Sequence, residues 1–245
     1  MEKNIVKRPA LLYFLTELIR GFWDRLGSLK YRWTYPKEIT SDKHPVLIIP
    51  GLLSDDSSTK TLSKLLRRAG YTVYGWELGR NMAKLTDIAQ LDKHLIQIYN
   101  RHQARVNIIG WSLGGIYARK IAADHAELTK QLITLGSPYQ DLNAPSWASY
   151  TVQYLWGSRE LIFPEEHREW IDHLGNPRPV PTTSIYSKQD GIVPWPCCIE
   201  DVEDELHQNI EVKSSHTSMI ANLDVLKICV DRVKTDVKDW KHYNS

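Results

Sequence analysis

The sequence feature that most constrains the fold is a short strand that turns at once into a helix. Residues 106–109 are rich in β-branched residues, which is typical of a strand, and residues 113–123 carry apolar residues at helical spacing. The turn between them, at residues 110–114, is Gly-Trp-Ser-Leu-Gly. This arrangement predicts that Ser112 lies at the apex of a strained bend, where its hydroxyl is exposed and the helix N-terminus favours negative charge. The flanking glycines allow strand and helix to pass closely.

A Gly-x-Ser-x-Gly pattern by itself is a weak indication of a catalytic serine, because it arises by chance in roughly one chain in ten of this length. It becomes strong when an acid and then a histidine follow at the ends of later strands. Asp190 comes directly after an expected strand at residues 183–187, and His216 follows one at residues 210–213. Taken singly, Asp190 is an ordinary turn aspartate and His216 a capping or surface histidine. Their order and positions favour a catalytic triad of Ser112, Asp190 and His216.

The roles of these residues follow from the chemistry of such triads. His216 removes the proton from Ser112 and later donates it to the leaving group, while Asp190 holds the imidazole tautomer. The developing oxyanion needs preorganised N–H donors, each worth ~3 kcal/mol. The backbone N–H of Leu113, next to the nucleophile, is one expected donor, and that of Leu52, in the loop after the first buried strand, is the other.

Short strands that alternate with helices predict an α/β fold with a mostly parallel sheet flanked by helices. The expected strands are residues 46–49, 72–76, 106–109, 131–135, 183–187 and 210–213, and the expected helices are residues 57–69, 87–101, 113–123 and 222–240. An edge strand is also expected near residues 31–34. The chain is expected to hold an N-terminal amphipathic helix and connection at residues 1–40 and one α/β domain at residues 41–245. Residues 141–181, rich in Trp, Tyr and Pro, are expected to form a short helical cap insertion.

The composition bounds the partners and cofactors. The chain is 42% hydrophobic and 24% charged with a net charge of +2, so nothing favours nucleic acid as a partner. Three cysteines, two of them adjacent, favour reduced thiols and a cytoplasmic location. No arrangement of Cys and His is typical of a metal site, and no metal or other cofactor is expected.

The N-terminal 30 residues form a second informative stretch. Their apolar run is too short to span a bilayer, and no small-residue cleavage site follows, so a signal peptide is not expected. A helix here would carry one apolar stripe, made of Leu11, Leu15, Leu18, Phe22 and Leu26. The simpler interpretation is a helix that packs on the chain's own domain. The alternative is an interfacial helix that contacts a membrane, peripherally at the inner surface, or a second copy of the chain.

Five motifs together make the chain resemble the α/β-hydrolase superfamily, in particular a bacterial lipase/esterase-like branch. They are Pro-Gly-Leu-Leu at 50–53, Gly-Trp-Glu-Leu-Gly-Arg-Asn at 75–81, Gly-Trp-Ser-Leu-Gly-Gly at 110–115, Ile-Thr-Leu-Gly-Ser-Pro at 133–138 and Tyr-Ser-Lys-Gln-Asp-Gly-Ile-Val at 186–193. The resemblance implies the α/β-hydrolase fold, a triad of Ser112, Asp190 and His216, and oxyanion donors at Leu52 and Leu113. The chain departs from the wider lipase pattern in having Pro50 where that pattern has a histidine.

The predicted function is that of a serine hydrolase that cleaves the carboxylic esters of small molecules or lipids through an acyl-enzyme. Trp111, Tyr139 and Trp195 are expected to line an apolar acyl pocket, although core packing explains aromatic residues equally well. The same triad serves a thioesterase or an acyltransferase. A hydrolase fold also serves as a non-catalytic ligand-binding protein, and the sequence leaves these alternatives open.

Overall fold

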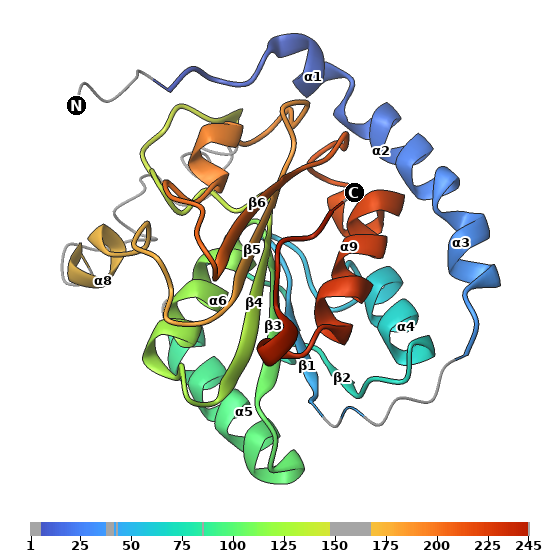
Figure 1. Ribbon diagram of the computed structural model, residues 1–245. Coiled ribbons are helices and arrows are strands. Elements are labelled where there is room, and N and C mark those ends of the chain that lie inside the picture. The colour runs from blue at the N-terminus through green and yellow to red at the C-terminus, as the bar shows by residue number, and fades with distance from the viewer. Residues whose placement is uncertain (1–5, 38–41, 43, 85, 148–167, 245) are drawn as a thin grey trace.

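One parallel sheet organises the structure, a computed structural model that describes residues 6–37, 42, 44–84, 86–147 and 168–244 (Figure 1). In that part of the chain the strands are β1 (Val46–Ile49), β2 (Val73–Tyr74), β3 (Val106–Trp111), β4 (Thr129–Leu135), β5 (Thr182–Tyr186) and β6 (His207–Glu211). They lie in the order β2-β1-β3-β4-β5-β6, and every neighbouring pair is parallel. The prediction of an α/β fold with a mostly parallel sheet is therefore confirmed.

Helices cover both faces of the sheet (Figure 1). On one face lie α4 (Lys60–Arg68) and α9 (Leu223–Lys234), and on the other lie α5 (Thr86–His102) and α6 (Leu113–Asp124). The strand residues alternate between the two layers: Val46 and Ile48 belong to the core under α4 and α9, while Leu47 and Ile49 belong to the core under α5 and α6. Burial on both faces explains why β1 is a continuous apolar run.

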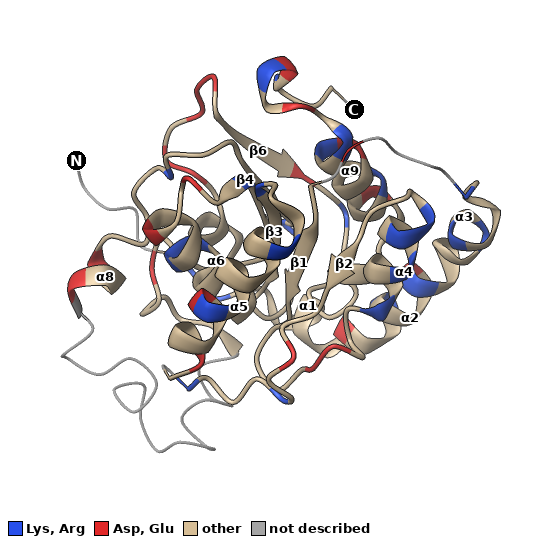
Figure 2. Cartoon of the chain, turned by 90° about the horizontal axis from the view of Figure 1, so that it is seen from below, with Lys and Arg blue, Asp and Glu red and all other residues tan. Residues whose placement is uncertain are grey.

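Seven further helical elements complete the described structure. They are α1 (Leu11–Leu15), α2 (Glu17–Gly27), α3 (Leu29–Thr34), α8 (Arg168–Asp172), η2 (Trp195–Cys198), η3 (Met219–Ala221) and η4 (Val237–Asp239). One of them, η3, adds Met219, Ile220 and Ala221 to the core under α4 and α9. Figure 2 shows lysines and arginines on α3 and on the neighbouring α4. None of the helices in the described ranges has the length and hydropathy needed to cross a membrane.

The expected edge strand at residues 31–34 is wrong, because these residues belong to α3. The Tyr35 N–H donates to the carbonyl of Tyr31 at 2.8 Å, which closes a helical turn. Residues four apart share one face of a helix. Both tyrosine rings therefore reach the core under α4 and α9, with their centroids 5.4 Å apart.

The N-terminal apolar stripe is present, but it faces away from the domain. The side chains of Leu15, Leu18 and Phe22 are 67, 78 and 61% exposed. The helix packs on the domain through the opposite face, where Glu17 and Gly21 are buried. The helix therefore packs on its own domain, as the simpler interpretation holds, but it does so through its polar face and leaves the apolar stripe exposed. The loops beneath α2 present backbone N–H groups and hydroxyls, which need polar partners that leucine cannot supply.

Two element boundaries also differ from expectation. The last strand begins and ends earlier than residues 210–213, at β6. The last helix ends at Lys234 rather than Trp240, because Thr235 adopts extended backbone angles and Asp236 caps the separate turn η4. The middle of the expected cap at residues 141–181 lies outside the described residues, which there include residues 141–147 and 168–181, so the cap remains a prediction.

Candidate active site

The bend that carries Ser112 joins β3 directly to α6. Ser112 has φ 54° and ψ −123°, a conformation that is strained for a residue with a side chain. The flanking glycines are required by space: a Cβ on Gly110 would lie 2.4 Å from the Cα of Gly115, and one on Gly114 would lie 2.3 Å from the carbonyl oxygen of Ile49. The backbone is therefore folded tightly at this point, and the Ser112 hydroxyl is directed out of the bend toward His216.

The structure brings the three predicted triad residues into one hydrogen-bonded line. His216 Nε2 lies 3.0 Å from Ser112 Oγ, and His216 Nδ1 lies 2.6 Å from Asp190 Oδ2. The three residues come from segments that follow β3, β5 and β6. Because the carboxyl ends of parallel strands meet at one edge of the sheet, residues far apart in the sequence converge there.

The acid is held by its own turn. Asp190 Oδ1 accepts hydrogen bonds from the N–H groups of Ile192 and Val193, each at 2.8 Å. These bonds occupy one carboxylate oxygen and leave Oδ2 for the imidazole of His216. The carboxylate is thus fixed in position before any substrate arrives, which is what orientation of the histidine tautomer requires.

The histidine is held from the side of the nucleophile as well. The indole N–H of Trp111 donates to the backbone carbonyl of His216 at 3.2 Å. Burial lowers the pKa of His216, but the charge and hydrogen bond of Asp190, together with the charge of Glu17, outweigh burial and raise the pKa above its ordinary value. A raised pKa strengthens the imidazole as a base, provided that the pH is high enough to keep it neutral.

The loop predicted to supply an oxyanion donor lies against the bend. A Cβ on Gly51 would lie 3.1 Å from the Cβ of Ser112, so Leu52 follows at the point where the loop touches the nucleophile. Leu113 is the first residue of α6, where N–H groups have no partner within the helix. Both residues therefore lie where oxyanion donors are needed, and the assignment itself remains a prediction.

Asn81 holds this loop, a role that the sequence analysis did not assign. Its side-chain N–H donates to the carbonyl of Pro50 at 2.9 Å, and its backbone carbonyl accepts from the N–H of Leu53 at 2.8 Å. Leu53 has φ 59°, so the loop is held in a strained conformation. The sequence signal that could have identified this role is the Gly-Arg-Asn end of the motif at residues 75–81, because Asn81 is the residue that bonds to the neighbouring loop.

Glu17 is the second residue that sequence analysis missed. It is 4% exposed and accepts hydrogen bonds from the N–H of Gly191 at 3.1 Å and of Thr217 at 2.8 Å, the residues that follow the triad acid and the triad histidine. No local signal pointed to it, because it lies 174 and 200 residues away from these partners.

The three aromatic residues predicted to line an acyl pocket have different surroundings. Trp111 is 8% exposed and supports the histidine, as described above. Tyr139 is 2% exposed, and its hydroxyl lies 2.6 Å from Ser184 Oγ in the core. Trp195 is only partly buried and stacks on Tyr186. Contact with a substrate remains a prediction for all three.

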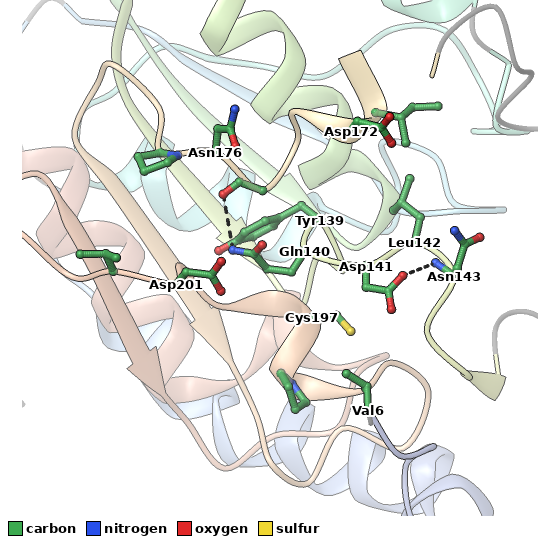
Figure 3. Close-up of a pocket in the computed structure, with 15 residues that line it drawn as sticks. Val6, Tyr139, Gln140, Asp141, Leu142, Asn143, Asp172, Asn176, Cys197 and Asp201 are labelled. Atoms are coloured by element: carbon green, nitrogen blue, oxygen red, sulfur yellow. Dashed lines mark hydrogen bonds between the residues drawn. The ribbon is translucent and has the colours of Figure 1, made fainter. Parts of the chain in front are cut away.

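A cavity of about 870 Å³ lies beyond Tyr139, between the segment after β4, α8 and η2 (Figure 3). Asp141, Asp172 and Asp201 are among the residues that line it. Ser112, Asp190 and His216 are not among its described lining residues, whereas Tyr139, one of the three aromatic residues predicted to line an acyl pocket, is. Within the described residues, no group of three His, Cys, Asp or Glu side chains is placed to hold a metal ion.

Comparison with known proteins identifies the fold. No protein-family profile matches the chain, and no curated protein matches it in sequence. Lipase B of Aspergillus fumigatus has a TM-score of 0.62 at 16% identity, over 82% of this chain and 56% of that one. The mature form of Bacillus licheniformis lipase BlEst2 has a TM-score of 0.59 at 16% identity, over 81% of this chain and 94% of that one.

A thioesterase domain from the curacin biosynthetic pathway also matches, with a TM-score of 0.52 at 16% identity over 80% of this chain and 93% of that one. The chain spans only a little over half the length of the Aspergillus fumigatus lipase. Likeness at these identities establishes architecture rather than activity. The chain has the α/β-hydrolase fold.

Proposed function

We propose that this chain is a serine hydrolase of the lipase/esterase-like kind that cleaves carboxylic esters. The observation that carries the proposal is the line of hydrogen bonds from Ser112 Oγ through the imidazole of His216 to Asp190. It is built on a strained bend at the strand ends of an α/β-hydrolase fold, which is where such folds carry a nucleophile.

The reaction proceeds in two halves. Ser112 Oγ attacks the ester carbonyl carbon while His216 Nε2 takes its proton, and the resulting oxyanion is stabilised by the N–H groups of Leu52 and Leu113. The tetrahedral intermediate breaks its bond to the alcohol oxygen, which receives the proton from His216, and an acyl-enzyme remains. Water then attacks the acyl carbon with the same imidazole as base, and the carboxylic acid and free Ser112 are released.

The environment of the histidine sets the pH dependence of this reaction. His216 acts as a base only when it is neutral. Burial lowers its pKa, but Asp190 and Glu17 outweigh burial and raise the pKa above its ordinary value. Ester hydrolysis is therefore expected to fall on the acidic side at a higher pH than an ordinary histidine would give. We place the reaction in the cytosol, where the three free and buried cysteines remain reduced.

The test is substitution of the nucleophile. The Ser112→Ala variant is expected to lose about 10³-fold or more of kcat/KM on a series of p-nitrophenyl esters, because attack by the hydroxyl is removed. Ser57→Ala, on an exposed turn, is the matched control and should keep wild-type rates. Acyl thioesters and alternative alcohol acceptors assayed in parallel separate hydrolysis of esters from the thioesterase and acyltransferase alternatives.

Covalent labelling completes the test. A fluorophosphonate probe should modify the wild-type protein at Ser112 and leave the Ser112→Ala variant unmodified. A folded wild-type protein that neither hydrolyses any ester nor reacts with the probe would overturn the proposal and leave a ligand-binding protein on the same fold.

A further inference from the structure

The N-terminal helices expose an unusual amount of apolar surface. Eleven of the fourteen large hydrophobic side chains that are exposed in the described residues belong to α1, α2 and α3. These eleven define the N-terminal apolar face: Leu11, Leu12, Phe14, Leu15, Leu18, Ile19, Phe22, Trp23, Leu26, Leu29 and Trp33. Single exposed hydrophobic residues are normal, but eleven of them on three successive helices mark an interaction surface.

The charges around the N-terminal apolar face are almost all positive. Residues 6–37 contain seven lysines and arginines and two carboxylates, Glu17 and Asp24. Both carboxylates point inward: Glu17 bonds to two backbone N–H groups, and Asp24 bonds to the N–H of Ser215 at 3.2 Å. The outer side of these helices therefore presents cations, among them the exposed Lys7 and Lys30.

The positive border continues from α3 onto α4 (Figure 2). A shallow hollow between the two helices is lined by Arg32, Trp33, Lys64 and Arg68. An indole beside basic side chains, next to an apolar helix face, is the composition of helices that lie in the interface of a lipid bilayer.

We propose that the N-terminal apolar face docks on a membrane surface that contains anionic lipids. A second copy of the chain fits less well, because a symmetric contact would place like charges opposite each other, and the carboxylates that would pair with them face inward. Anionic headgroups supply the missing negative charge, and the acyl region accepts the apolar side chains. This inference does not depend on the proposed esterase activity.

Flotation with lipid vesicles tests the proposal. The wild-type protein is expected to float with vesicles of phosphatidylcholine and phosphatidylglycerol, less with phosphatidylcholine alone, and less again in high salt. The Leu18→Ser and Phe22→Ser variants should each bind about tenfold more weakly, because an inserted apolar side chain is lost. The matched controls are Ile96→Ser and Leu206→Ser, exposed apolar residues outside this face, which should float as the wild type does.

Light scattering distinguishes the other occupant. A wild-type dimer that Leu18→Ser and Phe22→Ser dissociate, with no vesicle binding, would overturn the proposal in favour of a second copy. Equal flotation of Phe22→Ser and wild type would also overturn it. The Ser112→Ala variant should float like the wild type, so a failure of the esterase proposal leaves this test intact.

A separate observation concerns the inward face of α2. The carboxylate of Glu17 joins three groups: Oε1 accepts from the N–H of Thr217, and Oε2 accepts from the N–H of Gly191 and from Arg20 Nη2 at 2.9 Å. Thr217 follows the triad histidine and Gly191 follows the triad acid. One buried carboxylate therefore bridges the two loops whose separation determines the hydrogen bond between His216 and Asp190.

The packing of α2 on the acid turn leaves no room for a side chain at Gly191. A Cβ there would lie 2.4 Å from the carbonyl oxygen of Tyr13 and 2.7 Å from Glu17 Oε2. Arg20 also donates to the carbonyl of Gln189 at 2.8 Å, on the other side of the acid. Glu17 and Arg20, at the start of α2, thus bond to the residues on both sides of Asp190.

We propose that Glu17 is a positioning residue for the triad, which fixes the acid turn and the histidine loop relative to each other. The kinetic test of this proposal rests on the proposed function, whereas the second measurement, the pKa of the His216 ring, does not. Glu17→Gln keeps the size of the side chain but loses its charge and one acceptor. The matched control is Asp24→Asn, on the same helix and bonded to the same loop at the N–H of Ser215.

In Glu17→Gln, kcat/KM for a p-nitrophenyl ester is expected to fall with KM little changed. The acidic limb of the pH profile of kcat/KM should move to lower pH. The groups that face His216 are Asp190, which raises its pKa most, and Glu17, which raises it further. Asp24→Asn should lower the unfolding temperature without moving the limb. An unmoved acidic limb in Glu17→Gln would overturn the proposal and leave Glu17 as a merely structural residue.

The second readout is the pKa of the His216 ring by NMR titration, assigned with a His216→Gln variant. It should be lower in Glu17→Gln than in the wild type and unchanged in Asp24→Asn. This measurement needs no substrate, so it decides the proposal even if the protein hydrolyses no ester.

Discussion

The helices α2 and α9 are both amphipathic, yet they are oriented in opposite ways. α9 turns its apolar face inward, so that Val225, Leu226 and Val233 are fully buried in the core. α2 turns its apolar face outward and buries a glutamate and a glycine instead. The two helices contact each other, so the difference is not one of distance from the core.

What differs is the surface that each helix covers. α9 covers the apolar side chains of the sheet and of α4. α2 covers the loops after β5 and β6, which offer backbone N–H groups, hydroxyls and carbonyls close to the triad. The comparison teaches that an amphipathic pattern identifies two faces, and that the partner decides which face is buried.

The largest expected effect contrasts equal truncations of the two apolar faces. Leu226→Ala in α9 should lower the free energy of unfolding by ~3 kcal/mol, because it leaves a cavity in a fully buried site. Leu18→Ala in α2 should change it by less than ~0.5 kcal/mol, because that side chain is exposed. Urea unfolding measures both, and a large loss in Leu18→Ala would break the comparison.

The next effect concerns the small residue that lets α2 approach the histidine loop. A Cβ on Gly21 would lie 3.1 Å from Thr217 Oγ1 and 3.2 Å from Ser215 Oγ, whereas one on Gly27 meets nothing within 4 Å. Gly21→Leu should therefore cost ~2 kcal/mol of unfolding free energy through overpacking. Gly27→Leu, at the exposed C-terminal end of the same helix, should stay within ~0.5 kcal/mol of wild type. Equal stabilities of the two variants would mean that α2 does not pack as described.

The smallest effect is a pH dependence of stability at Glu17. Burial raises the pKa of this carboxyl above 4.5, more than the Thr217 N–H and Arg20 lower it. The folded state therefore binds more protons than the unfolded state, and this contribution to stability is lost as the pH rises from 4.5 through the folded pKa. Glu17→Gln lacks this titration. The stability advantage of wild type over Glu17→Gln should thus be greater below pH 4.5 than at neutral pH, as measured by urea midpoints.

Much of the sheet and of the bend at Ser112 follows from local patterns. The strand before the bend, the helix after it and the glycines between them depend on neighbouring residues, and each lies close to where the sequence predicted it. Asp190 and His216 were predicted from their positions after strands, and the structure places both within hydrogen-bond distance of their expected partners. The short α3 was mistaken for a strand because aromatic residues favour strands in general, and a four-residue spacing of Tyr31 and Tyr35 fits one face of either element.

The sequence alone determined the alternation of strands and helices, the bend and the order of the three polar residues along the chain, because these depend on side-chain periodicity and on local backbone sterics. Only the tertiary structure decided that the apolar stripe of residues 11–26 faces outward and that Glu17 lies between the acid turn and the histidine loop. The physical reason is that the surface beneath a helix determines which of its faces is buried. The backbone N–H groups of two distant loops need hydrogen-bond acceptors, which a carboxylate supplies and a leucine cannot.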